Sequence, residues 1–151
     1  MDTKQNISQQ DCNLNTCLFF STMKLAREFG KLADEAFRKT GLSPSHAVLL
    51  YTINIKGEVQ QKEVGELLHL TPSTITRLID KLERKGYVKK QSEGKNVCLR
   101  TTAEGLAQQE QIITSWNLLH SSYQNTLTAE ENASFLEISG RLIEKLTDKN
   151  I

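Results

Sequence analysis

The sequence predicts a mainly α-helical fold with one small β-hairpin, arranged as a winged helix-turn-helix core between N- and C-terminal helices. Apolar residues recur at helical spacing over most of the 151 positions. Residues 70–90, LTPSTITRLIDKLERKGYVKK, read as a capped amphipathic helix that stops at a glycine and leads into a basic strand. A polar turn and a second short alternating segment follow, which is typical of a hairpin.

Length and composition limit the class of protein. The chain has the size of one domain, with 25% charged and 38% apolar residues, so we expect it to fold and to be soluble. No apolar run approaches the roughly 20 residues that span a bilayer, so no membrane partner is expected. The N-terminus lacks the basic and apolar regions of a signal peptide. Cys12, Cys17 and Cys98 form no Cys-x-x-Cys pair, which favours a reduced, cytoplasmic protein.

Charge is distributed unevenly along the chain. The net charge is only +1, yet residues 60–100 hold nine Lys or Arg against five Asp or Glu, a local excess of +4. A basic middle between mildly acidic flanks favours a local surface for a polyanion. An ordinary solvated face remains the alternative on charge alone.

The N-terminal half predicts three helices before the one in residues 70–90. A long helix over residues 13–39 places Leu18, Leu25 and Leu32 seven residues apart, which suits packing against another helix. Ser43 is a good N-cap with Pro44 as the first residue of a buried helix that Gly57 ends. A short helix over residues 60–68 follows, and residues 69–71 join it to the next.

That next helix has two distinct faces. Thr71 is a good N-cap and Pro72 a good first helical residue. The apolar face, at positions i, i+3, i+4 and i+7, comprises Ile75, Leu78, Ile79 and Leu82. The outward face includes Ser73, Thr74, Thr76, Arg77 and Lys81. YVKKQ then predicts a strand, SEGKN a turn and VCLRT a returning strand, which completes a winged helix-turn-helix.

The outward face has the chemistry of a DNA-reading helix. An α-helix fits the major groove, where hydroxyls bond bases or phosphates and a threonine methyl can touch a thymine methyl. Arg77 can bond guanine O6 and N7 together. The lysines that we expect to attract the phosphates of the DNA backbone, without reading bases, are Lys81, Lys89, Lys90 and Lys95. The alternative for Arg77 is an ion pair with Asp80, or with a neighbour such as Asp34, on a solvated helix.

The C-terminal third predicts two more amphipathic helices. Thr102 in TTAEG can cap one, whose apolar positions include Ile112 and Trp116, and Thr128 to Glu131 form a capping box for the last. Together with the N-terminal helix they carry more apolar surface than one small core can bury, which favours a homodimer over a larger monomeric bundle. The residues that we expect at the dimer interface are Leu18, Leu25, Leu32, Leu142 and Leu146.

LTPSTITRLIDKLERKGYV, the wing and TTAEG together resemble the MarR family of bacterial transcriptional regulators. The resemblance covers nearly the whole chain and implies a single domain over residues 1–151, with a DNA-binding core at 43–102 and dimerisation helices at 13–39 and 103–149. It implies a homodimeric repressor that binds double-stranded DNA at a palindromic operator. It also implies release by a small phenolic or anionic effector, or by an oxidant.

The sequence departs from the family pattern in the wing. Glu93-Gly94-Lys95 replaces the usual Asp-x-Arg, and Thr101 replaces the leucine of Leu-Thr-x-x-Gly. Lysine keeps the charge but lacks the flat guanidinium that suits a narrow minor groove. We therefore expect an electrostatic contact from Lys95 with little shape selectivity; a plain turn lysine is the alternative.

Two other functions stay open. Cys17, in TCLFF, resembles the reactive cysteine of the family's peroxide-sensing branch, although phenylalanines and a serine follow it here instead of the supporting tyrosines. A winged helix can also serve as a protein-interaction module. The sequence does not support catalysis. His46, His69 and His120 have no Cys, Asp or Glu at the spacing of metal ligands, and there is no phosphate-binding loop or nucleophile motif. No cofactor or metal is therefore expected.

Overall fold

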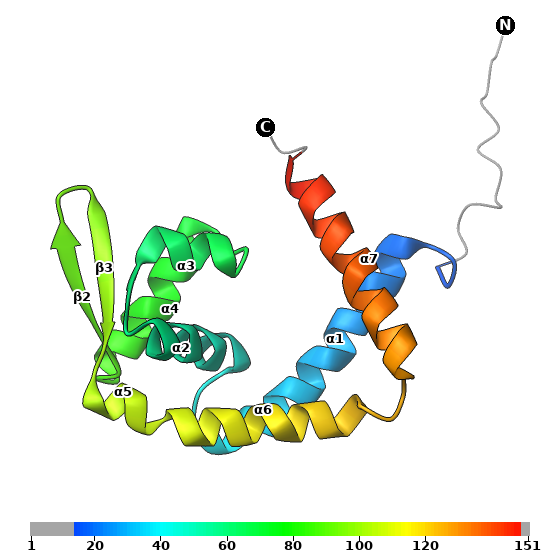
Figure 1. Cartoon of the computed structure of the whole chain (residues 1–151), viewed down its shortest axis with the longest axis horizontal. Coiled ribbons are helices and arrows are strands. Elements are labelled where there is room, and N and C mark those ends of the chain that lie inside the picture. The colour runs from blue at the N-terminus through cyan, green and yellow to red at the C-terminus, as the bar shows by residue number, and fades with distance from the viewer. Residues whose placement is uncertain (1–13, 149–151) are drawn as a thin grey trace, which may run out of the picture.

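The computed structural model describes residues 14–148 and confirms the predicted winged helix-turn-helix architecture. In chain order the elements are α1 (Leu18–Phe37), the 3-10 helix η2 (Arg38–Thr40), α2 (Pro44–Lys56), β1 (Glu58–Gln60), α3 (Gln61–Leu67), α4 (Pro72–Arg84), β2 (Val88–Glu93), β3 (Asn96–Thr101), α5 (Ala103–Ala107), α6 (Gln109–Tyr123) and α7 (Ala129–Asp148). A winged lobe of α2 to β3 lies at one end, and α6 leads from it to an arm formed by α1 and α7 (Figure 1). The long helix predicted over residues 13–39 is shorter in the structure, because residues 14–17 lie outside any helix and a 3-10 turn replaces the α-helix after Phe37. Residues 13 and 149, the predicted outer limits of the flanking helices, lie outside the described residues, as does Cys12.

Hydroxyl side chains start four of the helices, as the sequence predicted. Ser43 accepts a hydrogen bond from the backbone of the third residue after it, and Thr71 and Thr102 do the same for α4 and α5. Thr128 and Glu131 form the reciprocal capping box, with N···O distances of 2.8 and 3.1 Å. These contacts span only three residues, so they form wherever the local sequence allows them.

The sheet has three antiparallel strands in the order β1-β3-β2. β1 pairs Val59 with Leu99, and the sequence did not predict it because three residues carry no alternating pattern. The hairpin between β2 and β3 turns at Gly94, whose φ of +63° suits the first central position of a tight two-residue turn.

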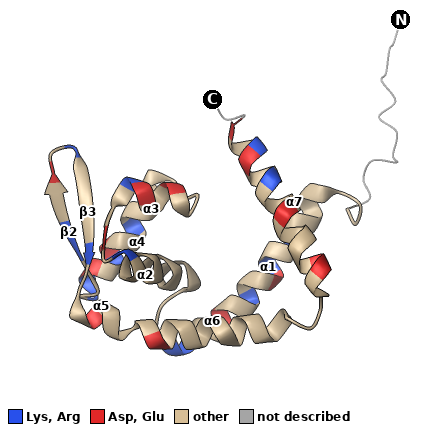
Figure 2. Cartoon of the chain, viewed as in Figure 1, with Lys and Arg blue, Asp and Glu red and all other residues tan. Residues whose placement is uncertain are grey.

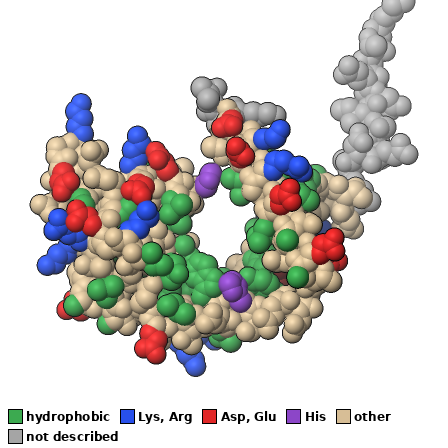
Figure 3. Space-filling view, viewed as in Figure 1, with side chains coloured by type: hydrophobic (Ala, Val, Ile, Leu, Met, Phe, Trp, Pro, Cys, Tyr) green, Lys and Arg blue, Asp and Glu red, His purple; other side chains and the backbone are tan. Residues whose placement is uncertain are grey.

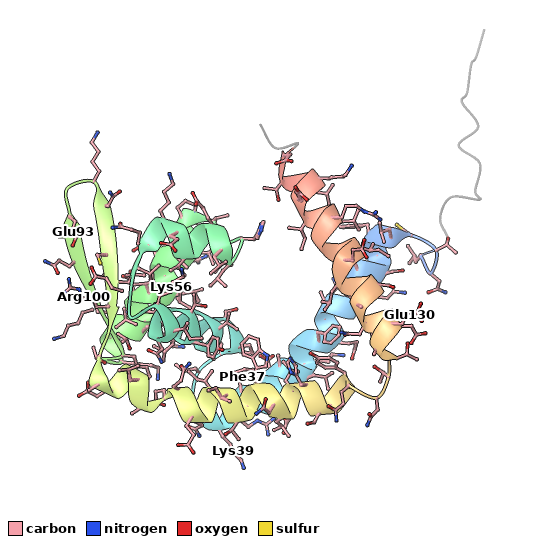
Figure 4. All side chains as sticks on the ribbon, viewed as in Figure 1. Phe37, Lys39, Lys56, Glu93, Arg100 and Glu130 are labelled. Carbon is pink, nitrogen blue, oxygen red and sulfur yellow. The ribbon has the colours of Figure 1, made fainter. Side chains whose placement is uncertain are left out.

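The core lies between α2, α4 and the sheet. Ile75, Ile79 and Leu82 are buried as predicted, and Leu78 is partly buried against the same cluster. Phe37 adds the end of α1 to this core, where α1, α2 and α6 meet (Figure 4). A single apolar cluster therefore sets the orientation of α4 on the lobe.

Asn54, a buried residue of α2, joins the winged lobe to the helix that leaves it. Its Nδ2 donates to the Gly105 carbonyl at 3.0 Å and to Gln109 Oε1 at 2.9 Å, and its Oδ1 accepts from the Thr101 hydroxyl. The single helix predicted from residue 103 is instead two, because the chain breaks at Gln108 between α5 and α6. The amide of Asn54 spans that break.

The arm leaves large apolar faces uncovered in the single chain. α7 has no buried residue, and α1 buries only Ala36 and Phe37 at its end. Leu18 and Leu146 are 67% and 60% exposed, while Leu25 and Leu32 are also exposed and Leu142 is half-buried. Hydrophobic side chains border the opening between arm and lobe (Figure 3). None of the helices within residues 14–148 combines the length and apolarity that a membrane span requires.

Candidate nucleic-acid interface

A tight turn sets α4 against α3. Leu70 N donates to the Gly65 carbonyl at 2.9 Å, and His69 takes a φ of +51°, which is uncommon for a residue other than glycine. Gly65 is buried against Ile75, so α3 approaches α4 closely. This is the helix-turn-helix arrangement, in which the second helix projects its outer face away from the core.

The predicted reading residues share that outer face of α4. Ser73, Thr76, Arg77 and Lys81 are exposed, and Thr74 is half-buried. The Thr71 hydroxyl donates to Thr74 Oγ1 at 2.9 Å, so Thr74 serves the start of the helix. Within residues 14–148, Arg77 forms no ion pair, and Asp80 bonds Lys90 instead. The alternative of an Arg77–Asp80 pair is therefore not what the structure contains.

Thr76 has a neighbour that sequence reasoning missed. Gln61 of α3 donates from Nε2 to Thr76 Oγ1 at 3.1 Å, while the Thr76 hydroxyl donates to the Pro72 carbonyl at 2.8 Å. The contact crosses fifteen positions between two helices, so no local pattern indicates it.

Lys89 and Lys90 point to opposite faces of the wing, because strand side chains alternate. Lys90 lies against α4, where its Nζ is 2.6 Å from Asp80 Oδ1 and 3.8 Å from Glu83 Oε1. The hydrogen bond to Asp80 is the main cause that raises the pKa of Lys90. Its backbone N–H also donates to Glu83 at 3.0 Å, so Lys90 braces the wing on α4, and its ammonium already has acidic partners. Lys89 is exposed opposite Arg100 on the outer face.

Lys95 occupies the turn of the wing and is exposed. An open groove of about 760 Å³ runs from the wing past α3 to the start of α4, and its lining includes Lys62, His69, Pro72 and Lys95. Lys and Arg residues mark α4 and the hairpin in Figure 2. Basic side chains thus border both the reading helix and the wing, as a phosphate backbone requires.

His46 lies behind this basic surface. The side chain is 9% exposed at the start of α2, with Nδ1 2.5 Å from the Ser43 hydroxyl. Burial lowers the pKa of His46, and the positive charges of Lys81 and Lys85 lower it further. A neutral imidazole under α4 adds no charge to the interface.

A sequence profile of the MarR family matches residues 40–96, the segment that holds α2, α3, α4 and most of the wing. Over this segment the chain is similar to the MarR family. Like the relatives that it matches, it is a DNA-binding transcriptional regulator.

Two relatives are transcriptional repressors of Bacillus subtilis. MdtR is 25% identical over 113 residues, which cover 73% of each chain, and YetL is 25% identical over 135 residues, which cover 86% of this chain and 81% of YetL. These relatives are regulators and not enzymes, in agreement with the prediction from the sequence.

Solved structures of the family share the fold. PcaV of Streptomyces coelicolor, in complex with its natural ligand, superposes with a TM-score of 0.79 at 24% identity, covering 87% of this chain and 95% of PcaV. MepR of S. aureus, in complex with DNA, gives a TM-score of 0.76 at 16% identity, covering 86% and 98%.

The two cysteines within residues 14–148 differ in environment. Cys98 is buried, and its thiol donates to Glu58 Oε1 at 3.1 Å, which raises the pKa of Cys98 and keeps it protonated. Cys17 is half-buried at the N-cap of α1, and both thiols are free. Cys17 is therefore the more accessible of the two thiols.

The outer face of the sheet brings three potential metal ligands together. Oxygens of Glu58 and Glu93 and the Cys98 sulfur lie within 4.8 Å of one another. However, Arg100 Nε bonds Glu58 at 3.0 Å, and Arg100 and Glu93 extend from the same hairpin (Figure 4). An arginine on one carboxylate and a protonated thiol do not suit a cation site.

Proposed function

We propose that this MarR-family regulator is a cytoplasmic homodimeric repressor that binds a palindromic operator and leaves it when a small phenolic or anionic ligand binds. The observation that carries the DNA-reading proposal is Arg77. Its guanidinium has no acidic partner within the described residues and lies exposed beside Ser73 on a capped helix. Lys81 is exposed on the same helix, and Lys89 and Lys95 add exposed positive charge on the wing.

The uncovered apolar faces of α1 and α7 support the homodimer. Leu18, Leu25, Leu32 and Leu146 are exposed in one chain, and water contact of so much apolar surface is unfavourable. A second copy related by a two-fold axis buries the same faces on both chains. Two α4 helices set about one DNA turn, roughly 34 Å, apart then match a palindrome.

An aromatic cluster beside the lobe supports a phenolic ligand. Phe37 and Tyr51 have ring centroids 6.2 and 5.7 Å from that of Trp116, and Tyr51 and Trp116 are partly exposed. Flat aromatic surfaces offer offset and edge-to-face stacking to a phenolic ring. The related CouR of Rhodococcus jostii was solved bound to p-coumaroyl-CoA.

A peroxide-sensing regulator is the second candidate. It is favoured by Cys17, a free thiol that is half-buried at the N-terminal end of α1. In that case Cys17→Ser abolishes peroxide-induced release and leaves DNA affinity unchanged. Release of the Cys17→Ser variant by peroxide would exclude this mechanism.

Fluorescence anisotropy on the DNA upstream of the chain's own gene, against a scrambled duplex, tests the repressor proposal. We expect binding to the native fragment at least about 10³-fold tighter, and a steep loss with salt. Arg77→Ala should weaken native binding by roughly 5- to 150-fold and leave the dimer intact.

Arg38→Ala is the matched control, because Arg38 is an exposed arginine of η2 outside α4 and the wing. Equal weakening by both variants would mean a general charge effect and not base reading. If Arg77→Ala binds the native fragment as tightly as the unchanged chain, Arg77 reads no base. If the chain binds a protein partner and no DNA at all, the winged helix would instead serve as a protein-interaction module.

A further inference from the structure

The Thr76 side chain is placed on the reading face of α4, but its hydroxyl is already engaged. One hydroxyl supplies one hydrogen to donate and two lone pairs. The hydrogen goes to the Pro72 carbonyl one turn back, at 2.8 Å, and Gln61 Nε2 donates to one lone pair at 3.1 Å. Both partners belong to the protein, so the hydroxyl has no hydrogen left for DNA.

This arrangement separates Thr76 from its neighbours. Arg77 and Ser73 are both exposed, and Arg77 keeps all five of its N–H donors available within the described residues. Phosphate oxygens and the guanine N7 and O6 atoms accept hydrogen bonds, so they need a donor, which Thr76 lacks. What this exposed side chain can still offer to a base edge is its γ-methyl group and one hydroxyl lone pair, which could only accept a hydrogen bond.

A methyl group in the major groove has one natural counterpart. The C5 methyl of thymine is the apolar feature that distinguishes a T·A pair there. We propose that Thr76 reads a thymine methyl in each operator half-site, close to the base pair read by Arg77. This inference rests on the proposed operator binding and names one base of the recognised sequence.

The operator is first obtained by selecting random duplexes on the full-length protein. Each thymine of the selected half-site is then replaced by deoxyuridine, which removes only the C5 methyl. We expect one thymine position in each half-site to be sensitive. Replacing it in one half-site should lower the affinity roughly fourfold, and replacing it in both should lower it about fifteenfold, because burying a methyl-sized group contributes about 0.8 kcal/mol.

Two substitutions at Thr76 divide the side chain into its parts. Thr76→Ser keeps the hydroxyl and loses the methyl, so the ratio of thymine to uracil affinity at that position should fall to about one. Thr76→Val keeps the methyl and loses the hydroxyl, so the ratio of thymine to uracil affinity should stay near four, even if this variant binds both duplexes more weakly. Circular dichroism checks that both variants stay folded.

The outcomes separate the two levels of the proposal. A serine variant that keeps the full ratio, or a valine variant that loses it, overturns the methyl reading while operator binding stands. Absence of any uracil effect does the same and points to the remaining hydroxyl lone pair accepting from an adenine or cytosine amino group. If selection enriches no sequence, the operator proposal fails and the methyl reading fails with it.

Discussion

Replacing Gly105 with alanine should destabilise the fold through one steric collision. A Cβ at this position meets the Tyr87 carbonyl oxygen at 2.1 Å, whereas ordinary contacts begin near 3.4 Å. The backbone φ of Gly105 is not positive, so the penalty comes from this collision and not from the conformation. The motif TTAEG therefore ends in glycine because α5 lies directly against the chain that leaves α4.

The magnitude follows from what must move. Relieving the overlap needs a shift of about 1.3 Å, and such overpacking costs about 1–3 kcal/mol. The shift also breaks the bond from Thr102 N to the Tyr87 carbonyl, 3.1 Å, and the bond from Asn54 to the Gly105 carbonyl, 3.0 Å, at about 1 kcal/mol each. Alanine has a better helix propensity than glycine, which offsets up to about 1 kcal/mol of this loss. The free energy of unfolding should therefore fall by about 2–4 kcal/mol.

Urea denaturation followed by circular dichroism at fixed protein concentration measures the change. Gly30→Ala is the matched control, because a Cβ at Gly30, inside α1, meets nothing within 4 Å. The control should gain about 0.5–1 kcal/mol from helix propensity alone. A Gly105→Ala protein as stable as the unchanged chain would refute the collision and the close packing inferred from it.

Three further predictions concern pH, the wing and the dimer. Burial and two lysines lower the pKa of His46, so the unfolded chain binds that proton more strongly than the folded chain does, and the free energy of unfolding should fall as pH drops through the ordinary value of 6.5. Urea midpoints at pH 7.5 and 5.5 measure this change. The variant His46→Gln should lose this part of the pH dependence. Lys90→Met should lower the free energy of unfolding by about 0.2–1 kcal/mol, because the ion pair of Lys90 with Asp80 is partly exposed. Lys89→Met, on the opposite face of the wing, should lower it by less. The reverse order would contradict the role of Lys90 in holding the wing on α4. Leu146→Asp should shift sedimentation from dimer toward monomer, and an unchanged dimer would place the interface elsewhere.

Much of the fold was predictable because its determinants are local. The caps at Ser43, Thr71 and Thr102 connect groups three residues apart, so a short stretch of sequence contains both partners. Apolar spacing on α4 likewise depends only on the helical repeat, and it identified the buried face correctly. The same repeat identified the exposed face on which Arg77 lies.

Contacts between distant segments were not predictable in this way. Lys89 and Lys90 are adjacent in sequence and alike in chemistry, yet only Lys90 faces the carboxylates of α4. The strand β1 exists because β3 offers it an edge, and the pKa of Cys98 is raised because β1 brings Glu58 beside it.

By itself, the sequence determined where the capped helices start, which face α4 buries and which segment carries the proposed DNA-reading residues, since these follow from neighbours within one or two turns. Only the tertiary structure decided which of those residues keep free donors. Gln61 reaches Thr76 across fifteen positions, and Asp80 pairs with Lys90 instead of Arg77. Hydrogen-bonding capacity is shared among groups that packing brings together, so the chemistry left for DNA depends on the whole lobe.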